Sequence, residues 1–172
     1  MFLGAFLHNP NADGVLWFIK EIFPKIILHI PDVRFFVVGD RPTDEISSLS
    51  SDNIIVTGYV EDVSAYFDAC RVFIAPLRYG AGVKGKINHS MSHGLPVVTT
   101  SIGAEGLDVT DNENVLIADD PDTFSQKVIQ LYNDEVLWNK LSTNSVDHIR
   151  RNFSYEHSKK IIQEFIDSLD KK

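Results

Sequence analysis

The chain has 172 residues, which is enough for one compact domain and too few for two large ones. Hydrophobic residues make up 44% and charged residues 23%, a globular composition that excludes a disordered chain. The formal net charge of -8 disfavours nonspecific nucleic-acid binding and a polybasic membrane anchor, because both require a basic surface. An anionic ligand must therefore be held by a local group of cations.

Short apolar runs alternate with helical periodicity through the first two thirds of the chain. Most of these runs are continuously apolar, as expected of strands that are covered on both faces. Between them, apolar residues recur every three to four positions from 15 to 26, where Pro24 predicts a kink. Shorter helices are expected around 63–67 and 88–91. The predicted strands are 2–7, 34–39, 53–57, 71–76, 96–100 and 115–118.

The last third of the chain contains only helical patterns, predicted at 121–132, 135–152 and 155–169. Asp119 or Asp120 is the expected N-cap of the first of these helices. The preceding β-α alternation predicts a parallel sheet with right-handed crossovers. We therefore expect an α/β fold, a Rossmann-like doubly wound parallel sheet of about six strands with C-terminal helices. No linker-like stretch divides it, so residues 1–172 should form a single domain.

Cysteine and histidine usage gives little support to a redox or metal function. Cys70 is the only cysteine, which excludes a disulfide framework and fits a reducing compartment. His89 and His93 have the i, i+4 spacing that can chelate zinc, but no third ligand is evident. No apolar run reaches the roughly 18–20 residues of a membrane span. We expect a cytoplasmic protein without a metal site.

The stretch 77–86, LRYGAGVKGK, contains three glycines and three cations and no acid. It follows a predicted strand and precedes a helix, at the sheet edge where open α/β proteins bind ligands. Glycines allow backbone N–H groups to approach an anion, and Arg78, Lys84 or Lys86 can neutralise phosphate oxygens. The pattern predicts a phosphate or diphosphate site, with a solvated Gly-Lys loop as the alternative. A G-x-G-x-x-G turn after the first strand is missing, which disfavours a dinucleotide dehydrogenase.

Residues 75–107, APLRYGAGVKGKINHSMSHGLPVVTTSIGAEGL, resemble the donor-binding region of family 4 (group 1) retaining glycosyltransferases of the GT-B fold. The most similar subgroup reads G-x-G-x-K-x-K, then a helix and G-L-P-V-V-T-T. Residues 9–18, 36–40 and 57–60 resemble further segments of that subgroup, in the same order. The resemblance covers nearly the whole chain and places it as the C-terminal, donor-binding domain of a two-domain enzyme.

The resemblance implies transfer of a sugar from a nucleotide diphospho-sugar, such as a UDP- or GDP-sugar, without a metal cofactor. Lys84 would stabilise the departing diphosphate as the catalytic group, and the turn after the third strand would receive the base. Synthesis of a cell-surface polysaccharide or glycan is the implied process. The implied donor-binding residues are Asn11, Gly58, Tyr59, Val60, Arg78, Gly80, Gly82, Val83, Lys84, Lys86 and His89.

The sequence departs from the wider family at three places. Two family glutamates, eight positions apart, fall at Ala81 and His89, and only the first loss is shared by the subgroup. The second glutamate accepts hydrogen bonds from the ribose, whereas a neutral imidazole nitrogen accepts only one. The basic residue usual in the first loop is also missing, because 8–11 reads HNPN and offers only polar groups.

No acceptor-binding domain precedes the first predicted strand. The chain is therefore expected to be part of a longer enzyme, or one half of an enzyme whose other half is a separate polypeptide. Its partners would be a nucleotide-sugar and that acceptor-binding domain, through which it could lie at the inner membrane face. A homodimer through the uncovered interdomain face is an alternative. Alternative functions are a degenerate, non-catalytic interaction module and a nucleotide-sugar 2-epimerase.

Overall fold

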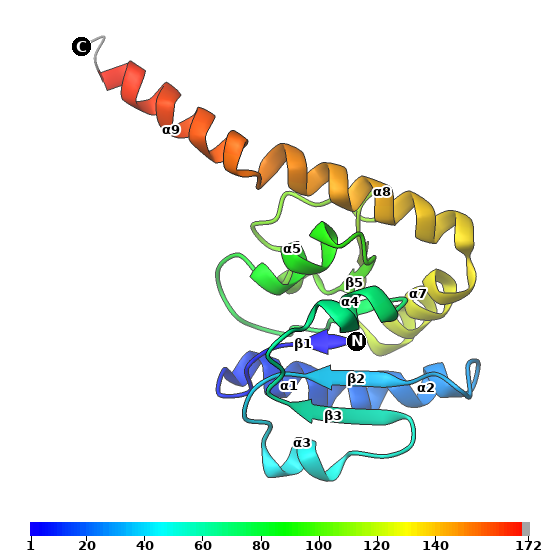
Figure 1. The fold of residues 1–172 in the computed structure, drawn as a ribbon. Helices are drawn as coiled ribbons and strands as arrows, with labels where there is room; N and C mark the ends of the chain where they lie inside the picture. The colour runs from blue at the N-terminus through cyan, green and yellow to red at the C-terminus, as the bar shows by residue number, and fades with distance from the viewer. Residues whose placement is uncertain (170–172) are drawn as a thin grey trace.

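The strands of the computed structural model, which describes residues 1–169, run parallel in two three-stranded ladders (Figure 1). One ladder has the order β1-β2-β3 and the other the order β4-β5-β6. All six predicted strands and their parallel pairing are confirmed. The strands are β1 (Phe2–Leu3), β2 (Phe35–Val38), β3 (Ile54–Gly58), β4 (Phe73–Ala75), β5 (Val97–Thr99) and β6 (Leu116–Ile117).

Main-chain hydrogen bonds of Met1 join the two ladders. The Met1 carbonyl accepts a bond from the Ile74 N–H at 2.8 Å, and the Met1 nitrogen donates to the Val72 carbonyl at 2.7 Å. Strands β1 and β4 are therefore neighbours, and the overall order is 3-2-1-4-5-6. This is the doubly wound order predicted from the sequence, with its switch point between β1 and β4.

Successive strand residues enter two hydrophobic clusters on opposite faces of the sheet, as the period of two in a strand requires. Phe2, Val37, Ile74, Val98 and Leu116 belong to the first cluster. Met1, Val38, Phe73, Val97 and Val115 belong to the second. Both faces are buried, which explains why the strands are continuously apolar.

Helices cover both faces. The first face carries α1 (Asn9–Trp17), the π-helical turn η1 (Phe18–Ile22), α2 (Phe23–Ile27), α3 (Asp44–Ser48) and α7 (Pro121–Asn133). The second carries α4 (Ser64–Ala69) and α5 (Gly85–Ser92). The short α6 (Ser101–Ala104) follows β5, and α8 (Glu135–Asn152) contacts both α5 and α7.

The predicted kink at Pro24 is a π-helical turn. Proline lacks an N–H, so it cannot make the usual bond to the carbonyl four residues earlier. Just before it, the Phe23 N–H donates to the Phe18 carbonyl, five residues back. The helical segment from α1 to α2 continues through this wider turn and keeps its apolar side against the sheet.

Two short helices were not predicted, and one strand is shorter than predicted. Helices α3 and α6 each begin after a threonine, Thr43 or Thr100, whose hydroxyl accepts an N–H from the first turn. The predicted strand 2–7 ends at Leu3. Its backbone bonding continues irregularly to Phe6, whose N–H donates to the Asp40 carbonyl at 3.0 Å, before the chain turns into α1.

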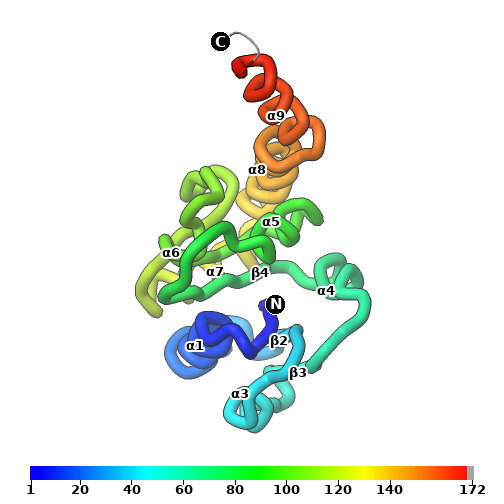
Figure 2. The backbone as a smooth tube through the Cα atoms, turned by 90° about the vertical axis from the view of Figure 1, so that its left-hand side faces the viewer, coloured from blue at the N-terminus to red at the C-terminus, as the bar shows by residue number. Residues whose placement is uncertain are grey.

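Helix α9 (Tyr155–Leu169) extends away from the rest of the domain in both views (Figures 1 and 2). Its residues are all exposed, although its sequence is strongly amphipathic. Phe165, for example, is 64% exposed. Within residues 1–169, no helix is long and apolar enough to cross a membrane. The other exposed apolar residues of α9 are Tyr155, Ile161, Ile162, Ile166 and Leu169.

Gly14 tests the close packing of α1 on the loop after β4. A Cβ at Gly14 would lie 2.5 Å from the Pro76 carbonyl oxygen, so α1 would have to shift. We expect Gly14→Ala to lower the free energy of unfolding by about 1–3 kcal/mol, although alanine is the better helix former. Chemical denaturation measures this. Gly85→Ala is the matched control, because its Cβ meets nothing within 4 Å. Equal stability of the two variants would contradict the proposed close approach.

Candidate functional site

A cavity of about 190 Å³ lies at the carboxyl ends of β1 and β4. One wall is the loop after β1 with the start of α1, and the other is the loop between β4 and α5. The two neighbouring strands lead to helices on opposite faces, so their loops separate and leave a crevice. The lining residues are His8, Pro10, Asn11, Leu77, Tyr79, Gly80, Ala81, Val83, Lys84, Gly85 and Lys86.

The cavity brings together five of the predicted binding residues: Asn11, Gly80, Val83, Lys84 and Lys86. Gly82 belongs to the same loop. Gly80 and Gly82 have φ angles of +123° and +79°, which side-chain-bearing residues rarely adopt. A glycine-rich loop therefore makes this turn without strain and keeps its backbone exposed to the cavity.

Two threonine side chains hold the start of this loop. The Thr99 hydroxyl donates to the Ala75 carbonyl at 2.9 Å, and the Thr100 hydroxyl donates to the Leu77 carbonyl. Both threonines are buried at the end of β5. Their part in the site was missed in the sequence, because the motif G-L-P-V-V-T-T reads locally as a strand with a polar end.

Lys84 is the N-cap of α5, and its side chain is buried. Its ammonium donates to the carbonyls of Gly82 at 2.7 Å and Gly80 at 3.3 Å. The Glu105 carboxylate lies 3.7 Å away, on the segment after α6. This lysine therefore folds the loop around its own charge, at the positive end of the α5 dipole. An anion bound there would compete with the exposed Glu105.

Lys86 reaches from α5 to the other wall. Its ammonium donates to the Asn11 side-chain oxygen and lies 4.3 Å from the centroid of the Phe2 ring. Burial lowers the pKa of Lys86 to about 7. The buried Asn11 side chain also donates to the Ala5 carbonyl at 2.8 Å. A chain of polar contacts thus connects α5 with the loop after β1.

Arg78 lies outside the lining of this cavity. Its guanidinium forms a two-pronged ion pair with Asp13 of α1 and lies over the Trp17 ring, 5.7 Å from the centroid. The hydrogen bond from Asp13 raises the pKa of Arg78. In this arrangement Arg78 braces the loop after β4 against α1, and its charge is already compensated.

His89 and the turn 58–60 are also outside the cavity, on the α4 side of α5. The His89 ring lies 4.5 Å from the Phe67 ring of α4 and 5.1 Å from the His93 ring, by centroids. Burial lowers the pKa of His89, and repulsion by His93 lowers it further. Gly58, with φ of +70°, ends β3, and Tyr59 is exposed. These residues lie farther along the same sheet edge.

The two histidines do not gather further metal ligands. His93 stacks on Phe67, and its Nδ1 lies 3.6 Å from the Asp68 carboxylate. Among residues 1–169, no group of three or more His, Cys, Asp or Glu side chains is arranged to hold a metal ion.

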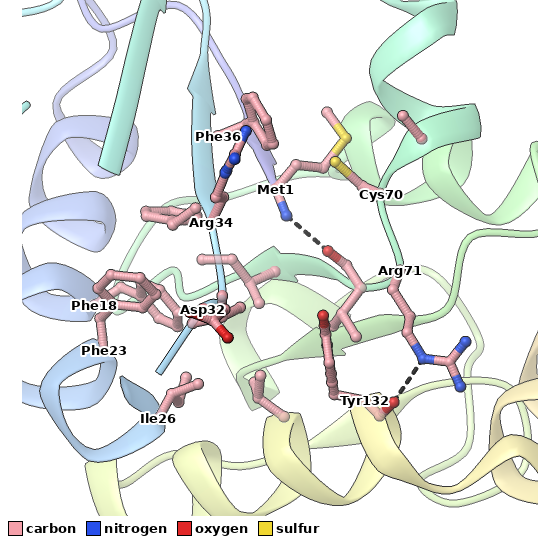
Figure 3. A pocket seen from close by; sticks show the side chains of 16 residues that line it. Met1, Phe18, Phe23, Ile26, Asp32, Arg34, Phe36, Cys70, Arg71 and Tyr132 are labelled. Atoms are coloured by element: carbon pink, nitrogen blue, oxygen red, sulfur yellow. Dashed lines mark hydrogen bonds between the residues drawn. The ribbon is translucent and has the colours of Figure 1, made fainter. Parts of the chain in front are cut away.

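A larger cavity, of about 350 Å³, opens at the opposite, amino-terminal edge of the sheet (Figure 3). Apolar side chains such as Phe18, Phe23 and Ile26 form much of its wall, with Tyr132 across from them. Arg71 donates to the Tyr132 carbonyl at 2.6 Å. Ligands of open α/β sheets bind at the carboxyl ends of the strands, so the smaller, cation-lined cavity is the better candidate site.

Comparison with known proteins gives a family match over residues 1–134, to the family described as "Glycosyl transferases group 1". Among curated proteins, the chain is 28% identical over 170 residues to an uncharacterized 44.6 kDa protein in the cps region of Klebsiella pneumoniae. The alignment covers 94% of this chain and 43% of that relative. The chain spans less than half the length of the curated relatives it matches.

Solved structures share the fold. TarM from S. aureus, in a complex with fondaparinux, alpha-GlcNAc-glycerol and UDP, matches with a TM-score of 0.78 and 18% identity. That match covers 96% of this chain and 34% of TarM. The C-terminal domain of LpcC, a group 1 glycosyl transferase from Francisella tularensis, matches with a TM-score of 0.68 and 16% identity. It covers 90% of this chain and 84% of that domain.

The low pKa of Lys86 predicts a pH-dependent stability difference. We expect Lys86→Met to unfold at a higher temperature than the wild type at pH 6, because methionine removes a buried charge. Between about pH 7 and the ordinary lysine pKa of 10.5, the unfolded chain binds more protons than the native one. The wild type should therefore gain stability relative to the variant as the pH rises through this window.

Thermal unfolding of both proteins from pH 6 to pH 10 tests this expectation. Lys160→Met, on the exposed helix α9, controls for the loss of a lysine. A stability difference between Lys86→Met and wild type that stays constant over this range would show that the Lys86 ammonium is not desolvated.

Proposed function

The chain belongs to the group 1 glycosyl transferases, and on this premise we propose that it is the donor-binding domain of a retaining glycosyltransferase. The donor would be a nucleotide diphospho-sugar, such as a UDP- or GDP-sugar. The observation that carries the proposal is the convergence of Lys84, Lys86 and a glycine loop on one cavity at the sheet's switch point. TarM, which shares the fold, is described in complex with UDP.

The diphosphate would occupy the cavity at the start of α5. Two lysines and the helix N-terminus supply positive charge there, and the glycine loop allows backbone N–H groups to approach. Lys84 would act on the reaction itself. As the bond between the sugar carbon and the diphosphate oxygen breaks, its electron pair passes to the diphosphate, which Lys84 stabilises while the acceptor oxygen bonds to that carbon. No metal ion is part of this proposal.

The nucleoside would run from the cavity along the sheet edge toward the end of β3. His89 lies about one turn after Lys86 on α5, facing α4, and the turn 58–60 precedes that helix. In this placement His89 would accept a ribose hydroxyl through its neutral imidazole, which its lowered pKa favours. Backbone groups at Val60 would receive the base. Arg78 would contribute to donor binding only by leaving Asp13.

The acceptor would be bound by another domain, absent from these residues. The chain covers 43% of the length of its K. pneumoniae relative, which leaves room for a second domain of similar size. The exposed apolar side of α9 is one surface that such a domain could cover. A homodimer would cover the same surface. The cps-region relative supports a role in polysaccharide synthesis, with a cytoplasmic domain held near the membrane by its acceptor-binding half.

A non-catalytic interaction module is the second candidate. Ala81, which lines the cavity, and His89 both stand where the family resemblance implies glutamates. Nucleotide binding distinguishes the candidates, because a degenerate module has no need of a donor. A 2-epimerase is less well supported. It would need carboxylates around the sugar, and Glu105, beside Lys84, is the acid nearest to this role in residues 1–169.

Removal of the Lys84 charge should weaken nucleotide binding. A hydrogen bond to a charged group contributes about 1.5–3 kcal/mol, so Lys84→Ala should lower the affinity for UDP or GDP about tenfold to a hundredfold. Isothermal titration with UDP, GDP and ADP measures this and identifies the base. Lys160→Ala is the control, because it removes a lysine far from the cavity. Absence of binding to folded wild type would favour the interaction module.

Residues 1–172 alone should bind the nucleotide without catalysing transfer. The acceptor hydroxyl has to be positioned within a few ångströms of the sugar, and no second domain provides that position here. Incubation with a radiolabelled nucleotide-sugar and candidate acceptors measures turnover. Clear transfer by this domain alone would contradict the division of the site between two domains.

A further inference from the structure

The ammonium of Lys86 lies between the two halves of the sheet rather than over its own helix. It originates from α5, but its contacts are with Phe2 of β1 and Asn11 of α1. A Cβ at Gly4 would lie 2.7 Å from this ammonium, so a glycine is needed there for it to fit. The first loop, which has no lysine or arginine of its own, thus receives a positive charge from α5.

Lys86 differs from the other two cations of the loop in having no carboxylate beside it. Arg78 pairs with Asp13, and Lys84 lies 3.7 Å from Glu105. Within residues 1–169, no acid lies within 4 Å of the Lys86 ammonium, and the side chain of Asn11 accepts its single hydrogen bond to protein. An ammonium has three N–H donors, so two remain for a ligand in the cavity that Lys86 lines.

We propose that the diphosphate of the donor is the counter-ion of Lys86, and that the domain takes up a proton at this side chain when the donor binds. The inference rests on the proposed function, because it assumes that a nucleotide diphospho-sugar occupies the cavity. It adds a second cation with a separate role. Lys84 holds the glycine loop together, whereas Lys86 charges the first-loop wall only when an anion neutralises it.

The direction of proton transfer follows from burial. With the cavity free of ligand, burial lowers the pKa of Lys86 to about 7, so about half of the molecules carry the proton at pH 7. A bound anion favours the charged form and raises the pKa. Binding should then take up about half a proton per site at pH 7, less at pH 6 and more at pH 8.

Other titratable groups face the same space and define the controls. His8 lines the cavity from the first loop, and Tyr79 and Lys84 line it from the loop after β4. Glu105 faces Lys84 from the segment after α6. Histidine titrates in the same pH range as the proposed change, so His8 is the group that could imitate it.

Isothermal titration with UDP-glucose, and with GDP-glucose in parallel, tests the proposal in the wild-type domain. These diphospho-sugars lack the terminal phosphate ionisation near pH 6 that UDP or GDP would add. Titrations at pH 6, 7 and 8, each in two buffers of different ionisation enthalpy, give the number of protons taken up. Binding whose enthalpy does not depend on the buffer would overturn the inference and leave the proposed function standing.

Variants assign the proton to its residue. Lys86→Met should abolish the uptake and weaken binding about tenfold to a hundredfold. Lys84→Met is the matched control, which should weaken binding yet keep the uptake. Uptake that persists in Lys86→Met and disappears in His8→Ala would assign it to His8 and overturn the inference. Failure of folded wild type to bind either sugar nucleotide would overturn the proposed function itself.

Discussion

The hydrogen bonds of the Met1 backbone with Val72 and Ile74 are the constraint on which the site depends. They place β1 beside β4, and thereby bring together two loops that are about seventy residues apart in the chain. The helices after these strands pack on opposite faces, so the loops separate and a cavity remains between them. Without this junction the molecule would be two three-stranded units, with Asn11 in one and the glycine loop in the other.

The cavity also shows how the fold tolerates positive charges that it does not fully neutralise. Lys84 is surrounded by carbonyl oxygens of its own loop, and Lys86 by an amide oxygen and an aromatic face. Neither environment replaces hydration as well as an anionic ligand would. Stability and binding are thus opposed at these two positions, and in an acidic protein they concentrate affinity for an anion in a small volume.

Helix α9 and the cavity belong to different levels of the same design. The cavity lies at the switch point and is complete in its two loops, whereas the apolar side of α9 projects from the domain without covering anything in residues 1–169. Its amphipathic pattern is that of a helix packed against another surface. In an enzyme that divides donor and acceptor between two domains, such a helix would connect the halves while the donor cavity remained open to the acceptor.

The sequence by itself determined the strands, their parallel arrangement and the glycine loop with its two lysines, because continuous apolar runs and a G-x-G-x-K-x-K pattern are local signals. It also indicated the π-turn at Pro24, since a missing N–H acts locally. Tertiary structure decided where each cation points. Arg78 looks equivalent to Lys86 in the loop, yet Asp13 of α1 holds it outside the cavity, and Lys86 crosses to Asn11 instead. These pairings join residues more than sixty positions apart, and only the packing of α1 beside β4 brings them within contact.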